Sequence, residues 1–79
     1  MREYPYAGER IRIEMVRCGF TLSSLSERTG ISTAVLRGIL TGRTQVVSTR
    51  SICALSTAFG YSAADFIDLL SRDPSPMII

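Results

Sequence analysis

The sequence contains no histidine and no lysine, so all nine of its basic residues are arginine. Without histidine, the usual zinc-ligand spacings and a thiol-imidazole pair are excluded. The acidic residues are scattered along the chain, and no glycine-rich phosphate loop is present. Because no catalytic constellation can be assembled from these residues, we expect a protein that is not an enzyme and that binds neither a metal nor a cofactor.

Long apolar runs are also absent, although 46% of the residues are hydrophobic. No run approaches the roughly 20 residues that a bilayer-spanning helix requires. The opening residues, MREYPYAGER, are charged from the start and lack the apolar region of a signal peptide. These features predict a soluble, cytoplasmic protein that does not interact with membranes.

Cysteine is scarce, with only Cys18 and Cys53 in the chain. In a reducing cytosol, a free cysteine behaves as a small hydrophobic residue. We therefore expect two buried, reduced thiols. A disulfide between them and a reactive thiol are the two alternatives.

Acidic residues are missing from the middle of the chain, between Arg28 and Ala64. Residues 1–27 have no net charge and residues 65–79 have a net charge of −2, so the positive charge is concentrated in the middle stretch, which carries +4. A polyanion such as DNA would meet that region first. An ordinary solvated surface charge is the alternative for each arginine of the stretch, which are Arg28, Arg37, Arg43 and Arg50.

The 79 residues suffice for a single domain, with a core of about residues 8–71 and a C-terminal tail at 72–79. A domain this small buries only about 60% of the surface that its unfolded chain exposes, so its stability is marginal unless it dimerises. Prolines lie only near the ends, and glycines divide the rest into segments of helical length. We predict an all-α domain of five short helices, at residues 9–18, 22–29, 33–40, 49–59 and 63–71.

The predicted helices combine capping residues with apolar positions three and four apart. Thr21, Ser32 and Ser62 are expected to cap three of them. The residues expected to face inward are Ile11, Met15, Cys18, Leu22, Leu25, Val35, Leu36, Ile39, Ile52, Leu55 and Phe59, with Phe66, Ile67, Leu69 and Leu70 as the apolar positions of the last helix.

The segment from Thr21 to Gly42 has the layout of a helix-turn-helix, with Gly30 to Ser32 as the turn. Ser26 is the small residue that lets the two helices cross closely. The side chains on the outer face of the second helix are short except for Arg37, so this helix can enter a groove about 12 Å wide. That face consists of Ser32, Thr33, Ala34, Arg37, Gly38 and Thr41.

These segments resemble the lambda repressor and Cro family of helix-turn-helix regulators over about residues 8–66. GERIRIEM is similar to the opening helix of the family, TLSSLSERTGIS to its positioning helix and turn, and TAVLRGILTG to its recognition helix. STRSICALSTAFGYSAADF is similar to the fourth helix and the start of the fifth. The resemblance implies a sequence-specific transcriptional regulator, a repressor that acts as a homodimer on a palindromic operator. Leu22, Leu40 and Met15 depart from the residues that the family often has at these positions.

The chemistry of the side chains suggests a role for each predicted DNA contact. Arg37 can bind guanine O6 and N7 bidentately, and Ala34 can pack on a thymine methyl group. Thr33 and Thr41 can contact bases or phosphates. Ser32 and Thr21 are equally compatible with a role as helix caps alone. The predicted phosphate contacts are Arg43, Thr44 and Gln45 in the loop that follows, and Ser23, Ser24 and Thr49 near helix N-termini.

Several apolar residues remain after the predicted core is filled. We expect them to form a homodimer interface, because helix-turn-helix dimers span two half-sites about 34 Å apart. A disordered end is the alternative for the tail. These residues are Ile13, Val16 and Phe20 in the first helix and just after it, Ile67 and Leu70 in the last helix, and Met77, Ile78 and Ile79 in the tail.

A second function is open on the same fold, namely an antitoxin-like or other protein-interaction module. Leu22, Leu40 and the surplus apolar surface favour it. Its partner would be a toxin or another regulator, in place of or in addition to double-stranded DNA.

Overall fold

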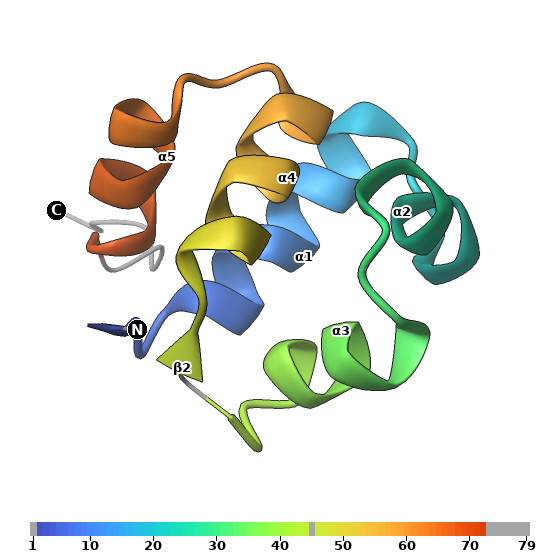
Figure 1. Ribbon diagram of the computed structural model, residues 1–79, viewed down its shortest axis with the longest axis horizontal. Coiled ribbons are helices and arrows are strands. Elements are labelled where there is room, and N and C mark those ends of the chain that lie inside the picture. The colour runs from blue at the N-terminus through green and yellow to red at the C-terminus, as the bar shows by residue number, and fades with distance from the viewer. Residues whose placement is uncertain (1, 45, 73–79) are drawn as a thin grey trace, which may run out of the picture.

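The computed structural model describes residues 2–44 and 46–72, and its helices confirm the expected all-α domain (Figure 1). Among the described helices, none combines the length and the hydropathy needed to cross a bilayer. The elements in chain order are β1 (Arg2–Glu3), α1 (Ala7–Cys18), α2 (Leu22–Thr29), α3 (Thr33–Leu40), β2 (Val46–Val47), α4 (Thr49–Phe59) and α5 (Ala63–Leu70).

Polar caps determine where α2 to α5 begin. Thr21, Ser32 and Ser62 each accept a hydrogen bond from the backbone N–H three residues further on, as predicted, and Ser48 does the same for α4. Each cap satisfies one of the backbone donors that a helix leaves unpaired in its first turn.

α1 ends at a glycine in the left-handed conformation, and after this glycine the chain turns back onto the core. Gly19 has φ 75°. The Phe20 N–H then donates to the Met15 carbonyl at 2.8 Å, which satisfies a carbonyl in the last turn of the helix. The Phe20 ring packs edge-on against Phe59 at a centroid distance of 5.8 Å.

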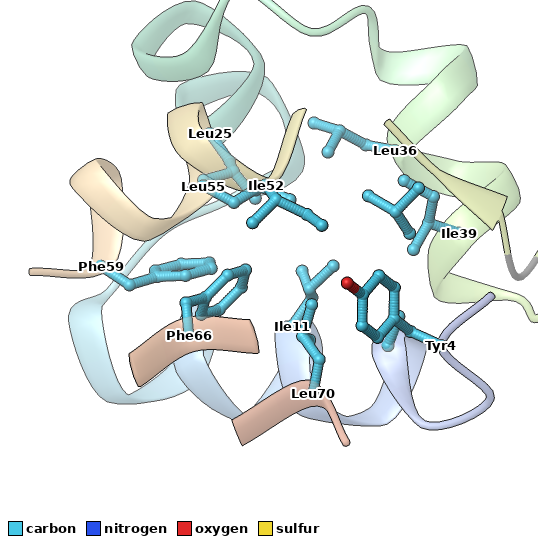
Figure 2. Packing of buried hydrophobic residues seen from close by; sticks show 12 residues of the cluster. Tyr4, Ile11, Leu25, Leu36, Ile39, Ile52, Leu55, Phe59, Phe66 and Leu70 are labelled. Atoms are coloured by element: carbon cyan, nitrogen blue, oxygen red, sulfur yellow. The ribbon is translucent and has the colours of Figure 1, made fainter. Parts of the chain in front are cut away.

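One hydrophobic core joins all the helices (Figure 2). α4 packs against α1, α2 and α5, while α3 packs against α1 and α2. In Figure 2, Phe59 and Phe66 lie at one end of the cluster, and Ile39 and Tyr4 lie at the other. The buried hydrophobic residues are Tyr4, Ala7, Ile11, Leu25, Leu36, Ile39, Val47, Ile52, Leu55, Phe59, Phe66 and Leu70.

A short antiparallel strand pair accompanies the helices and was not predicted from the sequence. Arg2 pairs with Val47, and Glu3 pairs with Val46. Two-residue strands are too short to show the alternation of apolar and polar residues by which strands are recognised. The pair connects the N-terminus to the segment between α3 and α4.

Three residues expected in the core lie on the surface. Cys18 and Cys53 are exposed free thiols, so the prediction of buried thiols is wrong. Cys18 is the last residue of α1, where Phe20 folds back and fills the space beside Phe59. Val35 is 49% exposed, because α3 turns Leu36 and Ile39 inward and the preceding position points about 100° away.

Candidate nucleic-acid interface

The turn between α2 and α3 is held by side-chain and backbone hydrogen bonds. The Ser26 hydroxyl donates to the Ile31 carbonyl at 2.6 Å, and the Gly30 N–H donates to the Ser26 carbonyl at 2.8 Å. The Thr29 hydroxyl accepts from the Ile31 N–H at 3.2 Å. Ser26, which was predicted only as the small residue at the helix crossing, thus also fixes the path of the chain into α3 through its hydroxyl.

The outer face of α3 is exposed and consists mainly of short side chains. Ser32 is the cap of the helix, and the Thr41 hydroxyl donates to the Arg37 carbonyl at 2.9 Å. These hydroxyls are thus partly used within the helix, although both residues remain exposed. The exposed residues of this face are Ser32, Thr33, Ala34, Val35, Arg37 and Thr41.

Gly38 does not belong to that exposed face, so its predicted contact with DNA is wrong. It is buried, and the Thr44 methyl group lies 3.6 Å from the place where a Cβ on Gly38 would stand. The Thr44 N–H also donates to the Gly38 carbonyl at 3.2 Å. The loop after α3 folds back over the helix, so that Thr44 covers this point.

The arginines of the acid-free stretch are exposed. Among the described residues, none of them has a side-chain hydrogen bond or an ion pair. Of the predicted loop contacts, Arg43 and Thr44 follow directly after α3. Gln45 lies outside the described residues. The exposed arginines are Arg28, Arg37, Arg43 and Arg50.

The predicted contacts near helix N-termini differ in availability. Ser23 and Thr49 are exposed in the first turns of α2 and α4. Ser24 is engaged in a reciprocal capping box, in which its backbone N–H donates to the Thr21 hydroxyl at 3.1 Å and its own hydroxyl accepts from the Thr21 N–H at 2.9 Å. The Ser24 hydroxyl therefore has less capacity left for a phosphate than the Ser23 hydroxyl.

Two residues that the sequence analysis did not assign to the site connect α1 to the end of α3. A Cβ on Gly8 would stand 2.5 Å from the Ile39 carbonyl oxygen, so only glycine permits this approach. The Arg12 guanidinium donates from Nη2 to the Leu40 carbonyl at 3.2 Å. A glycine inside a helical pattern is the sequence feature that indicates such close packing.

A buried polar cluster lies on the other side of the molecule, where α1 meets the corner between α4 and α5. Glu14 is 4% exposed and accepts from Arg17 Nε at 2.6 Å and from the Tyr61 hydroxyl at 3.0 Å. Arg17 Nη2 also donates to the Phe59 carbonyl at 2.9 Å. Burial and the hydrogen bond to Glu14 raise the pKa of Tyr61, and the hydrogen bond to Glu14 raises the pKa of Arg17.

The residues predicted to form a dimer interface also have different environments. Leu70 is fully buried in the core, so its predicted role in an interface between subunits is wrong. Ile67 is partly buried and packs against the core, and so does Phe20. Ile13 is 44% exposed and Val16 is 79% exposed. Residues 77–79 lie outside the described residues.

Comparison with known sequences identifies the family. A model of the helix-turn-helix domain family matches residues 7–69. The chain belongs to the helix-turn-helix domain family. The lambda repressor-like fold expected for this helix-turn-helix protein is confirmed.

A comparison with solved structures finds the same fold in a complex of the SinR and SinI proteins. The TM-score is 0.72 at 24% sequence identity. The match covers 78% of this helix-turn-helix protein and 60% of the solved chain, so the solved chain extends well beyond the shared domain. No curated protein matches the sequence.

Proposed function

We propose that this helix-turn-helix protein is a non-enzymatic, sequence-specific transcriptional regulator that inserts α3 into the major groove of double-stranded DNA. The observation that carries the proposal is the outer face of α3, which has short side chains, with Arg37 on it and Arg43 beside it, neither of which has a partner within residues 2–44 and 46–72. A continuous stretch without acidic residues surrounds this face, so no carboxylate of the stretch repels a phosphate there.

Base readout is assigned to the residues that project from the exposed face of α3. Arg37 has no partner among the described residues, so its guanidinium is available to bind guanine O6 and N7. The methyl groups of Ala34 and Val35 suit the thymine methyl group, and Thr33 and Thr41 suit bases or phosphates at the edges of the contact.

Phosphate contacts are assigned to the loop and to the helix N-termini on either side of α3. Arg43 and Thr44 follow α3 directly, while Ser23 and Thr49 lie in the first turns of α2 and α4. Helix N-termini attract phosphate because their free N–H groups and the helix dipole both favour negative charge. These contacts fix the register of the protein on DNA but read no sequence.

Selection of bound duplexes from a random pool, followed by a salt titration on the recovered sequence, tests the proposal. We expect one preferred sequence, and an affinity that falls with a log–log slope of about −0.9 for each phosphate contact. The preference for the selected duplex over a scrambled one should persist at each salt concentration. Weak binding that is uniform across duplexes would contradict sequence-specific regulation.

We further propose that the protein acts as a repressor in the form of a homodimer on a palindromic operator. The exposed apolar side chains of Ile13 and Val16 support an interface that uses the outer side of α1. Ile67, which is partly buried against the core, is a further candidate contact. A two-fold dimer predicts two half-sites whose centres lie about 34 Å apart in the selected duplex. Sedimentation at tens of micromolar protein should show a dimer, and a monomer there without DNA would count against it.

A second candidate is a protein-interaction module on the same fold, with a toxin or another regulator as the partner. The same exposed side chains of α1 favour it, and the similar solved structure is itself a complex of two proteins. The duplex selection tests whether a protein partner has replaced DNA, because a module that binds only a protein predicts no recovered sequence. A Val16→Asp variant that selects the same duplex as the parent would show that this exposed part of α1 is not needed for recognition of DNA sequence.

A further inference from the structure

The N-terminal arm, residues 2–6, is joined to the loop between α3 and α4. Arg2 and Glu3 pair through their backbones with Val47 and Val46, which form the last part of that loop. Both contacts link segments more than 40 positions apart in the sequence. The arm therefore holds the end of the loop that leads into α4.

The other end of the same loop is held against α3. Gly42 has φ 77°, and its N–H donates to the Ile39 carbonyl at 3.1 Å. The Thr44 N–H donates to the Gly38 carbonyl at 3.2 Å. Arg43 lies between these two hydrogen bonds and is exposed.

The arm itself has a rigid base. Tyr4 is 3% exposed within the core, and its carbonyl accepts from the Ala7 N–H at 3.0 Å at the start of α1. The next residue, Gly8, lies directly against the Ile39 carbonyl. These contacts link the arm, the first turn of α1, the end of α3 and the described residues of the loop.

We propose that the N-terminal arm is a positioning element that pre-organises the loop so that Arg43 meets a DNA phosphate without a further ordering cost. This inference rests on the proposed DNA-binding function. Without the arm, Val46 and Val47 lose their backbone partners, so the loop has more freedom to lose on binding, and that cost would reduce affinity. Arg43 is the residue that touches phosphate, and the strand pairing acts through it.

The test compares a deletion of Arg2 and Glu3 with the double variant R2A/E3A. Both lack the same two side chains and have the same net charge, but only the double variant keeps the backbone that pairs with β2. We expect the deletion to weaken binding to the selected duplex by roughly three- to tenfold, and to make its salt slope shallower by about one. The double variant should bind like the parent, and all three proteins should select the same sequence.

Combining the deletion with Arg43→Ala isolates the positioning effect. If the arm acts through Arg43, the loss of affinity caused by Arg43→Ala will be smaller in the deletion background than in the parent. Additive losses in the two backgrounds would overturn the proposal. So would a deletion protein that binds with the affinity and salt slope of the parent.

Hydrogen exchange separates a failure of this inference from a failure of the proposed function. In the deletion, the Thr44 amide should exchange faster, while the interior amides of α2 and α3 keep the parent's protection. Unchanged protection of Thr44, or loss of protection throughout the domain, would overturn the arm's role. A parent protein that binds no duplex would instead overturn the DNA-binding function, and the phosphate-positioning role with it.

Discussion

Two regions of this protein use arginine in opposite ways. At the corner of α1, α4 and α5, Arg17 is bound to the buried Glu14 carboxylate and to the Phe59 carbonyl. Beside the turn and α3, Arg37 and Arg43 have no partner among the described residues. The comparison shows that the difference lies in the neighbours, because the corner includes a carboxylate and the stretch around α3 includes none. The arginine of the corner has partners within the fold, whereas Arg37 and Arg43 are exposed to solvent and accessible to a ligand.

The largest effect, a loss of folding stability, is expected when the Glu14 carboxylate is removed from the corner. Glu14→Ala leaves the Tyr61 hydroxyl and part of the Arg17 guanidinium without their acceptor, so the free energy of unfolding should fall by roughly 1–3 kcal/mol. Urea unfolding measures this change. Glu27→Ala is the control, because Glu27 is exposed and has no hydrogen-bond or ion-pair partner among the described residues. Equal stability of the two variants would contradict a structural role for the corner.

Two helix caps allow a direct comparison of the regions, because the cap of α2 lies in the helix-turn-helix and the cap of α5 lies at the corner. Thr21→Ala at α2 and Ser62→Ala at α5 each remove a hydroxyl that accepts from a backbone N–H, which should cost about 1 kcal/mol of stability in both variants. Only Thr21→Ala should also weaken binding to the selected duplex, because α2 carries predicted phosphate contacts. If Ser62→Ala weakened binding as much, the division into two regions would fail.

Removal of single arginine charges should separate the regions by their salt dependence. Arg43→Ala should make the salt slope of duplex binding shallower by about one, as expected for one lost phosphate contact. Arg72→Ala removes the same charge just after the end of α5, where Arg72 is paired with Asp68 at 2.6 Å, and should leave the slope unchanged. Equal slopes for the two variants would mean that Arg43 contributes only to the net charge.

The smallest effect is expected at high pH in the corner. Burial and Glu14 raise the pKa of Tyr61 in the folded state, whereas in the unfolded chain this group titrates near pH 10. Above about pH 10, the unfolded state therefore loses the Tyr61 proton first, and stability falls until the pH passes the raised folded pKa. The stabilisation is fully present below that range. Tyr61→Phe should lose less stability than the parent between pH 9 and pH 11 in urea unfolding, and an identical loss would show that Tyr61 does not contribute.

The sequence predicted the helices well because their start and end residues act locally. The ranges 22–29, 33–40 and 49–59 agree with α2, α3 and α4, since side-chain caps and left-handed glycines depend only on neighbours within a few positions. The predicted exposure of Arg37 and Arg43 is also confirmed.

Features that depend on distant partners were not predicted. Glu14 is buried because Tyr61, 47 positions away, satisfies it together with Arg17. Helical periodicity alone predicts that a glutamate lies on the surface. Periodicity also wrongly predicted buried side chains for Val35, which lies next to the inward-facing Leu36, and for Cys18, which lies at the end of α1. The strand pair and the covering of Gly38 by Thr44 likewise depend on the path of a loop, which no local pattern specifies.

The central claim is that the exposed face of α3 reads DNA sequence through Arg37. The most direct measurement is the base preference of Arg37→Ala on the selected duplex and its single-base-pair variants, with Arg72→Ala as the charge-matched control. We predict that Arg37→Ala loses roughly 1–3 kcal/mol of discrimination at one base pair and keeps its preference elsewhere, whereas Arg72→Ala keeps the full preference of the parent. An unchanged preference profile in Arg37→Ala would contradict the account.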